Sequence, residues 1–313
     1  MKIAFLADAL DSFKVGKDST FAMMEEAQKR GHMIYAFEPQ DVALSNGEVM
    51  ARSVRIALTG QEDVGWYRVD ETAFFRLADF DAVIVRKDPP FDMNYLCSTW
   101  LLELAEVAGA RIFNRPQALR NYNEKVAIAR FPQFVVPTLV SSDEILLREF
   151  HAIHQDVIFK PLDGMGGMGI FRIRADGMNM GPVIESLTED GNRAIMAQRF
   201  IPEIVSGDKR VLLINGEVVP YALARIPQNG DIRGNLAAGA MGVAQPLSAR
   251  DREIAETLAP ELAEAGLFLV GLDIIGDWLT EINVTSPTCF REIAAQTGFD
   301  VVEMFFNALD EMI

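Results

Sequence analysis

The sequence has little cysteine, little histidine and a deficit of positive charge. Its 313 residues include only two cysteines, Cys97 and Cys289, too few for a disulfide framework, which favours a reducing compartment. Lysine and arginine total 29 against 45 aspartates and glutamates, for a formal net charge of −16. Nucleic acids and anionic membrane surfaces repel such a chain, so neither is expected as a partner. An anionic small ligand requires a local cluster of basic residues.

Long hydrophobic runs are also missing. No apolar run approaches the ~20 residues that span a bilayer, and the first run, from Lys2 to Ala7, is too short for a secretory signal. Half of the residues are nevertheless hydrophobic, which is ample for sizeable cores, and the length favours about two domains. The sequence therefore predicts a globular cytoplasmic protein that does not associate with membranes.

The first third of the chain alternates short apolar runs with amphipathic segments. Strands are expected at residues 2–7, 33–37, 81–85 and 111–114, and helices at 19–30 and 95–107. This β-α-β alternation predicts an α/β domain with a largely parallel sheet. A further helix is expected at 117–131, with a domain boundary near residue 122.

Beyond the boundary, strands become denser and pair as hairpins, which is typical of an α+β region. Strand pairs are expected at 156–161 with 170–174, 210–214 with 217–223, and 267–275 with 278–284. The second pair flanks Asn215-Gly216 and the third flanks Gly276-Asp277, both favourable two-residue turns. A helix is expected at 248–265 with Ser248 as its N-cap. The stretch from Arg225 to Gly242 reads as one long loop, and loops of this length are usually functional lids or disordered.

The segment Gly164-Met165-Gly166-Gly167-Met168-Gly169 matches the G-x-G-x-x-G pattern of dinucleotide-binding folds. That pattern needs a helix after the glycines, but residues 170–174 are rich in β-branched and aromatic side chains and predict a strand. A glycine loop between two strands can close its backbone N–H groups over phosphates, and Lys160 just upstream could add a cation. The alternative interpretation is a plain mobile hairpin tip.

The third predicted hairpin concentrates oxygen-bearing side chains. Glu281 and Asn283 are two residues apart on one strand and so share a face, and Asp273 lies nearly opposite Glu281 if the turn centres on Asp277. Two carboxylates and an amide oxygen suit Mg²⁺, which leaves its other positions to water and phosphate. The alternative is a solvated hairpin face, although the apolar residues around these carboxylates would make their burial costly without a cation.

Other candidates carry weaker signals. Five basic residues, Lys125, Lys160, Arg210, Arg225 and Arg233, lie in segments rich in glycine, proline and asparagine, yet any single arginine is more commonly a surface charge. His151 and His154 lack a third metal ligand and are expected on a solvated helix face. Cys289 has no histidine nearby in the sequence, so a nucleophilic role has little support.

Four segments resemble the bacterial glutathione synthetase family: residues 87–92 (KDPPFD), 160–167 (KPLDGMGG), 234–239 (GNLAAG) and 280–288 (TEINVTSPT). The resemblance runs from the first strand almost to the C-terminus. It implies the ATP-grasp fold, with an N-terminal α/β substrate domain (1–122), a central lid domain (123–200) and a C-terminal domain with metal and substrate sites (201–313). It also implies ATP-dependent ligation of γ-glutamylcysteine and glycine through an acyl phosphate, with Mg²⁺ or Mn²⁺, in a homotetramer.

The resemblance also implies roles for individual residues. ATP contacts are expected at Lys125, Lys160, Met165, Gly166, Gly167, Gln198, Phe200, Ile201 and Asp208. Arg210, Arg225 and Arg233 are expected to stabilise phosphate and developing charge, while Arg86, Asn235 and Ser286 hold the dipeptide and Asp273, Glu281 and Asn283 bind the metal. The sequence departs from the family pattern at Phe200, where tyrosine is expected, and at Met241, where the mobile loop is expected to carry an arginine.

Three other functions fit parts of the sequence. An ATP-grasp ligase for another acid and amine, such as a peptide or D-alanine ligase, would use the same chemistry, and only the resemblance argues against it. A non-catalytic nucleotide-binding module would not need both the oxygen-rich hairpin and the lysines. A nicotinamide oxidoreductase would need a helix, not a strand, after the glycine loop.

Overall fold

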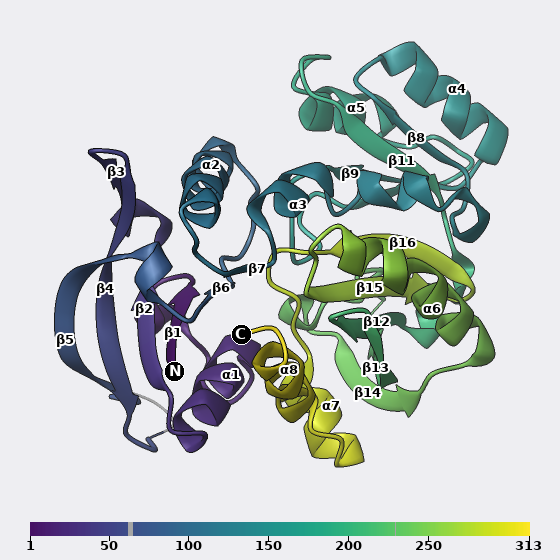
Figure 1. Ribbon diagram of the computed structural model, residues 1–313. Coiled ribbons are helices and arrows are strands. Elements are labelled where there is room, and N and C mark those ends of the chain that lie inside the picture. The colour runs from purple at the N-terminus through teal and green to yellow at the C-terminus, as the bar shows by residue number, and fades with distance from the viewer. Residues whose placement is uncertain (62–64, 229) are drawn as a thin grey trace.

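The computed structural model describes residues 1–61, 65–228 and 230–313, which form three β-sheets with helices packed around them (Figure 1). The sheets have seven, four and five strands and follow one another along the chain. Both termini lie close together, beside helices α1 and α8 (Figure 1). The mixed α/β class predicted from the sequence is confirmed.

The N-terminal sheet has a parallel centre, as the β-α-β alternation predicted. Its buried strands pair in the order β2-β1-β6-β7. The strands are β1 (Lys2–Leu6), β2 (Met33–Phe37), β6 (Ala82–Val85) and β7 (Ile112–Phe113), and the main helices are α1 (Ser19–Lys29) and α2 (Met93–Val107). Asp18 and Asp92 begin these helices by accepting hydrogen bonds from the backbone N–H groups of Phe21 and Tyr95.

An antiparallel extension of this sheet was not predicted. Strands β3 (Val42–Ser45), β4 (Glu48–Leu58) and β5 (Tyr67–Arg76) add to β2 through β4. Strand β5 is mostly exposed and β4 is only half buried, so their sequences lack the continuous apolar runs that marked the parallel strands. The expectation of a largely parallel sheet therefore holds only for the centre of the sheet.

The helix expected at 117–131 is interrupted, and that prediction was wrong. Helix α3 (Pro116–Asn121) ends at Tyr122, and a short 3₁₀ segment follows at Val126–Arg130. Between them, the side chain of Asn123 accepts hydrogen bonds from the backbone N–H groups of Lys125 and Val126. Asparagine competes with the helix in this way because its side chain satisfies nearby backbone groups.

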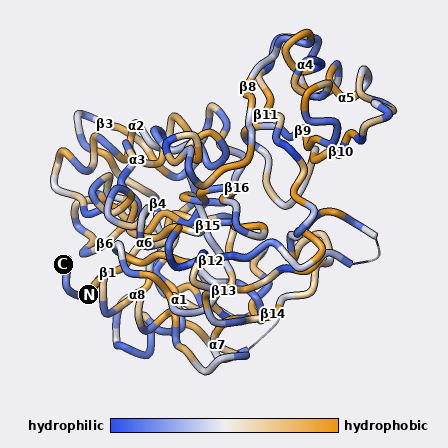
Figure 2. The backbone as a smooth tube through the Cα atoms, turned by 90° about the vertical axis from the view of Figure 1, so that its right-hand side faces the viewer, coloured by the Kyte–Doolittle hydropathy of each residue, from blue (hydrophilic) through white to orange (hydrophobic). Residues whose placement is uncertain are grey.

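The second sheet forms a small separate layer that projects from the rest of the chain (Figures 1 and 2). Its order is β10-β9-β11-β8, with all pairs antiparallel. It consists of β8 (Thr138–Ser141), β9 (Val157–Pro161), β10 (Phe171–Ile173) and β11 (Ile195–Arg199), covered by α4 (Glu144–His154) and α5 (Met180–Thr188). It has its own core, which includes Leu147, Phe159 and Ile184.

The third sheet has the order β14-β13-β12-β15-β16, and all of its pairs are antiparallel. Its strands are β12 (Asp208–Ile214), β13 (Glu217–Ile226), β14 (Met241–Pro246), β15 (Leu269–Ile275) and β16 (Trp278–Asn283). The helices are α6 (Ala249–Glu264), α7 (Phe290–Thr297) and α8 (Val301–Asp310). Both predicted two-residue hairpins and the Ser248 cap are confirmed.

The long loop expected from Arg225 to Gly242 is shorter than predicted. Its two ends pair as strands β13 and β14, with Ile226 opposite Met241 and Arg225 opposite Gly242. Glycine-rich composition alone did not reveal this pairing, because the partner strand supplies the hydrogen bonds. The paired strands therefore extend to Ile226 on one side and Met241 on the other.

Hydrophobic and hydrophilic stretches alternate along the whole chain (Figure 2). Among the residues that the structure describes, no helix is both long enough and apolar enough to cross a membrane.

Candidate active site

Three adjoining cavities run between the sheets. The first lies between the second sheet and the third and is lined by all nine residues predicted to contact ATP. The second includes Arg210, Arg225, Asn283 and Ser286, and the third contains Arg86. Neighbouring cavities share lining residues, such as Glu281 for the first two and Ser286 for the last two. Every site residue predicted from the sequence therefore lines one of these three cavities.

The glycine loop connects two antiparallel strands, β9 and β10, so it lacks the helix that a dinucleotide-binding fingerprint requires. Its Gly164 carbonyl accepts a hydrogen bond of 2.7 Å from Lys125 Nζ. At Gly167, a Cβ atom would lie 2.8 Å from Asn235 Oδ1 and 2.9 Å from Arg233 Cδ. The glycine loop thus lies directly against Arg233 and Asn235, and both segments line the first cavity.

The segment after β11 forms the largely apolar side of the first cavity. Gln198 is buried and donates from Nε2 to Thr138 Oγ1 at 3.1 Å, and Ile201 is also buried. The Phe200 ring lies 3.5 Å from the guanidinium carbon of Arg172, a cation–π contact. An apolar wall of this kind with an amide at its edge suits a flat heterocycle.

The opposite wall is a row of buried charges on the third sheet. Asp273 pairs with Glu281 across β15 and β16 and with Arg210 across β12 and β15. Arg210 Nε lies 2.6 Å from Asp273 Oδ1, and Arg225 Nη2 lies 2.9 Å from Asp273 Oδ2. Burial opposes ionisation of Asp273, but the two guanidiniums outweigh it and hold the pKa of that carboxyl below its usual range.

Asp208 also lies on this wall, with its Oδ2 2.6 Å from Arg225 Nη2. Its Oδ1 is buried and has no hydrogen-bond partner among the described residues. Burial, together with repulsion from Asp273 and Glu281, raises the pKa of Asp208 to about 6. Asp208 therefore leaves one carboxylate oxygen available to a ligand or cation.

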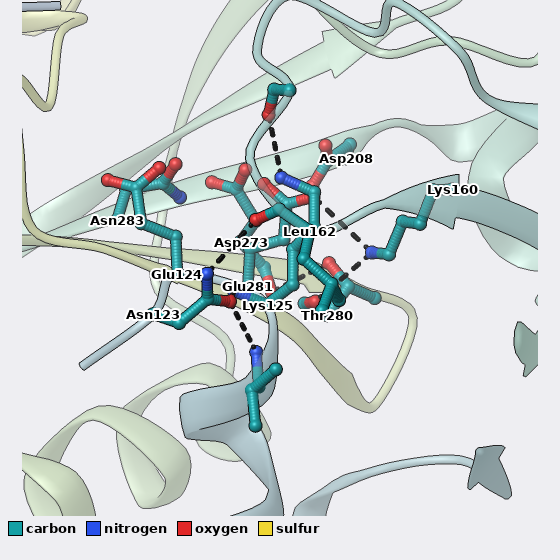
Figure 3. Close-up of polar contacts among 12 residues, drawn as sticks. Asn123, Glu124, Lys125, Lys160, Leu162, Asp208, Asp273, Thr280, Glu281 and Asn283 are labelled. Carbon is teal, nitrogen blue, oxygen red and sulfur yellow. Dashed lines mark hydrogen bonds and ion pairs between the residues drawn. The ribbon is translucent and has the colours of Figure 1, made fainter. Parts of the chain in front are cut away.

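Glu281 sits between two lysines at the junction of the first two cavities (Figure 3). Its Oε1 lies 3.3 Å from Lys160 Nζ and 3.7 Å from Lys125 Nζ. Burial opposes ionisation of Glu281, but the two ammonium groups lower its pKa. Burial also lowers the pKa of Lys160.

The donor set of this wall fits a hard divalent cation. Asp273 and Glu281 present carboxylates on one face of a hairpin, and Asn283 uses its Nδ2 to donate to the Gly271 carbonyl at 3.2 Å, which leaves its oxygen free. Oxygen donors with few carboxylates are what Mg²⁺ prefers. Lysines and arginines balance these carboxylates in the described structure.

At the far end, the third cavity is organised around Arg86. This arginine is only 3% exposed, and its Nε donates to Thr20 Oγ1 at 3.0 Å. Its Nη1 is buried without a partner among the described residues, and burial lowers the pKa of the guanidinium. A buried arginine with a free N–H fork suits a carboxylate.

Sequence reasoning missed several lining residues of the second cavity, including Glu124, Asp88, Thr288 and Cys289. Glu124 gave no signal because it fell inside a segment predicted as a continuous helix. Asp88 belongs to the 87–92 segment, whose resemblance to the family could have revealed it. Burial raises the pKa of the Cys289 thiol, which disfavours the thiolate that a nucleophilic role would need.

His151 and His154 line none of these three cavities, and His151 is buried instead of lying on a solvated helix face as expected. His151 Nε2 makes a 2.8 Å hydrogen bond with the Arg174 carbonyl oxygen. Across the described residues, no three histidine, cysteine, aspartate or glutamate side chains are grouped so as to hold a metal ion. The candidate metal set on β15 and β16 consists of two carboxylates and one amide, so it is not such a group.

Comparisons with known proteins show to which family the chain belongs. Residues 124–298 match the family described as prokaryotic glutathione synthetase, ATP-grasp domain, and residues 1–120 match its N-terminal domain. The glutathione synthetase of Ralstonia nicotianae is 59% identical over 310 residues, covering 99% of this chain and 95% of the relative. That of Nitrosomonas europaea is 55% identical over 315 residues, covering 100% and 98%.

Comparison with solved structures identifies the fold of this chain. D-cycloserine synthetase DcsG superposes with a TM-score of 0.71 at 17% identity, covering 99% of each chain. The ATP-grasp ligase PsnB superposes with a TM-score of 0.61 at 20% identity, covering 99% of this chain and 97% of that one. These likenesses show the ATP-grasp fold, and the sequence matches over the full chain show more: the chain belongs to the prokaryotic glutathione synthetase family.

Proposed function

We propose that this enzyme joins γ-glutamylcysteine to glycine at the expense of ATP, giving glutathione, ADP and phosphate. The observation that carries the proposal is the shared wall of the first two cavities. Asp273 and Glu281 line both of them, so a nucleotide phosphate in the first and a carboxylate in the second would meet at the same charged face. That arrangement suits phosphorylation of a carboxylate.

The first cavity is assigned to ATP. Gln198, Phe200 and Ile201 would receive the adenine, with Asp208 on the ribose side. Lys125 and Lys160 would contact the phosphates, covered by the backbone of Met165, Gly166 and Gly167. Exposed backbone N–H groups and lysines together bind phosphate well.

Asp273, Glu281 and Asn283 would hold the divalent cation, which we infer to be Mg²⁺, with Mn²⁺ as the alternative. Its binding would draw the two carboxylates away from their present ion pairs with Arg210, Arg225, Lys125 and Lys160. When bound, such a cation neutralises charge on phosphate. The released lysines and arginines would then face the phosphate groups.

The chemistry follows from the weakness of a carboxylate as an electrophile. The cysteinyl carboxylate of the dipeptide attacks the γ-phosphorus, the bond to the β-phosphate oxygen breaks, and an acyl phosphate and ADP result. The glycine ammonium group loses one proton to solvent, and the free amine attacks the acyl carbon to form the C–N bond. The C–O bond breaks with its electron pair on phosphate, which takes up the second proton of the amine. Arg210, Arg225 and Arg233 would stabilise the charge that develops, and the two contacting loops would exclude water.

The dipeptide would extend from the second cavity into the third. Ser286 lines both cavities, Asn235 lines the second, and Arg86 lies in the third. The free fork of Arg86 would bind the carboxylate at the γ-glutamyl end. Recognition at this end would then fix the reacting carboxylate of the dipeptide against the charged wall.

We further infer a homotetramer that works in the cytoplasm. Helix α2 supports self-association because none of its exposed residues is charged: Met93, Asn94, Cys97, Trp100, Leu104 and Val107. Two copies of a chain with a net charge of −16 repel each other except at uncharged faces. Light scattering on the purified enzyme tests the tetramer, and a monomeric mass at micromolar concentration would contradict it.

The decisive assay measures ADP release with ATP, Mg²⁺ and γ-glutamylcysteine, with and without glycine. Glycine-dependent ADP release with an equal amount of glutathione is expected. Release only with a different acid and amine would keep the ligase chemistry and overturn the substrates. Tight ATP binding without release for any pair would overturn the enzymatic function.

A further inference from the structure

The carboxylates that line the second cavity differ in their partners. Asp273 is paired with two arginines and Glu281 with two lysines. Glu124 also lines this cavity, but it forms no ion pair with any lysine, arginine or histidine in the part of the chain that the structure describes. Its negative charge is thus available to a ligand.

Hydrogen bonds fix the orientation of Glu124. Its Oε1 accepts from the backbone N–H groups of Val284 at 2.9 Å and Thr285 at 3.1 Å, and from Thr285 Oγ1 at 2.8 Å. Its own carbonyl accepts from the Ile282 N–H at 2.8 Å. Oε2 takes part in no hydrogen bond within residues 1–61, 65–228 and 230–313. One oxygen is therefore anchored while the other remains at the cavity.

The anchor also fixes where Glu124 lies relative to the reacting groups. Its partners Ile282, Val284 and Thr285 lie on either side of Asn283 in the sequence, directly after Glu281, and Figure 3 shows Glu124 beside Asn283. The adjacent Lys125 faces Glu281 and the glycine loop. Glu124 thus sits at the edge of the charged wall, where the activated carboxylate would form.

The second substrate of the proposed reaction is an amino acid, which carries an ammonium group at neutral pH. An ammonium group needs an anion that is not already neutralised, and Asp273 and Glu281 are committed to cations. Asp88 also has no ion pair among the described residues, but it lies at the end of the cavity shared with Arg86, away from the charged wall. We propose that Glu124 is the binding residue for the ammonium group of the amine substrate. This assignment rests on the proposed function, since it names the group that receives that reaction's second substrate.

Glu124→Gln tests the assignment with little structural change. The amide retains Oε1, and with it the acceptor for the three anchoring hydrogen bonds, while the charge disappears. KM for glycine should rise about 10- to 100-fold, the range for loss of one charge-assisted hydrogen bond. KM for ATP and for the dipeptide should change little, and so should the melting temperature. An unchanged KM for glycine would overturn the assignment.

Hydroxylamine separates amine binding from activation of the carboxylate. It is uncharged at neutral pH, so it can attack an acyl phosphate without an ammonium site. Glu124→Gln should form the hydroxamate of γ-glutamylcysteine at close to the wild-type rate while glutathione synthesis falls. A parallel loss of both products would show a general defect and overturn the assignment.

Asp88→Asn is the matched control, because it removes one negative charge from the same cavity at the end that adjoins Arg86 and the third cavity. It should not raise KM for glycine. If Asp88→Asn raises KM for glycine and Glu124→Gln does not, the ammonium site is at Asp88. A wild-type enzyme that yields neither hydroxamate nor glutathione would instead contradict the proposed function, so the two failures can be told apart.

Discussion

The two walls of the first cavity are built in opposite ways. The wall from the second sheet consists mainly of apolar side chains and a glycine loop, with Lys160 and Gln198 as polar groups, and its sheet has a small core of its own. The wall from the third sheet carries Asp208, Arg210, Arg225, Asp273 and Glu281, which are paired across four neighbouring strands. One wall would recognise its ligand by shape and backbone groups, and the other by charge.

This difference sets how each wall responds to substitution. On the charged wall, removing one member leaves its partners buried and uncompensated, which costs several kcal/mol. In the glycine loop, the backbone N–H groups survive any substitution except proline, so a substitution there acts mainly through steric interference or altered closure of the loop. We expect the largest effects on the charged wall and smaller ones as the substitution moves into the loops.

Glu281→Gln should have the largest effect, lowering kcat/KM about 10³-fold. The change weakens the cation site and leaves Lys125 and Lys160 facing each other without a counter-charge. Steady-state kinetics across Mg²⁺ concentrations measures it. Glu217→Gln, at an exposed position of β13, is the matched control and should leave kcat/KM unchanged. Near-normal turnover of Glu281→Gln at ordinary Mg²⁺ concentrations would contradict the assignment of Glu281 as a metal ligand.

Arg233→Ala should lower kcat about 10²-fold while the free enzyme keeps its affinity for ATP. In the described structure Arg233 is partly exposed and pairs with Asp231, so it would reach the phosphates only when the loops close. Kinetics and equilibrium nucleotide binding separate the two quantities. Arg252→Ala, on the exposed side of α6, provides the control. A collapse of ATP affinity would show that Arg233 contributes to the open site instead.

Asp208→Asn should alter how stability depends on pH. The raised pKa of Asp208, about 6, means that its contribution to stability is complete below its unfolded-state pKa and is lost as pH rises through about 6. Between pH 7 and pH 5 the wild type should therefore gain about 1.4 kcal/mol relative to the variant, roughly tenfold in the folding equilibrium. Denaturant unfolding at both pH values measures this gain. Parallel pH profiles would show that Asp208 has no raised pKa.

Gly167→Ala should have the smallest effect, about a fivefold loss of kcat/KM for ATP. Gly166 and Gly167 both have positive φ, at 64° and 81°, so alanine brings similar backbone strain at either position. Only at Gly167 would the new Cβ collide with Asn235 and Arg233, since nothing lies within 4 Å at Gly166. Gly166→Ala is thus the matched control. Equal losses in the two variants would mean that strain, not loop contact, decides the effect.

Local patterns in the sequence were sufficient to predict turns and strands where neighbouring residues decide the backbone conformation. The two-residue turn at Gly276-Asp277 was predicted from its own residues, but by itself it would place Asp273 opposite Thr280. A β-bulge between Asp273 and Ile274 shifts the register, so that Asp273 lies opposite Glu281. The strand after the glycine loop followed from its β-branched and aromatic residues. Both predictions depended on residues within about ten positions of each other.

Predictions failed where a distant segment competes with local preference. The helix expected at 117–131 is broken because Asn123 caps its own backbone while Glu124 binds residues 282–285. Strands β3 to β5 lack a continuous apolar run because they lie at the edge of the sheet. Neither partner segment can be identified from the local sequence.

The sequence by itself determined the fold class, the family and the types of side chain at the site, since turns, periodicity and motifs are local properties. Only the tertiary structure decided which charges neutralise one another and which remain free. Arg86 shares a cavity with Ser286, and Glu124 is anchored by Thr285, across 160 residues or more. The availability of a buried charge depends on its neighbours in space, because burial and nearby charges set its energy, and folding alone brings those neighbours together.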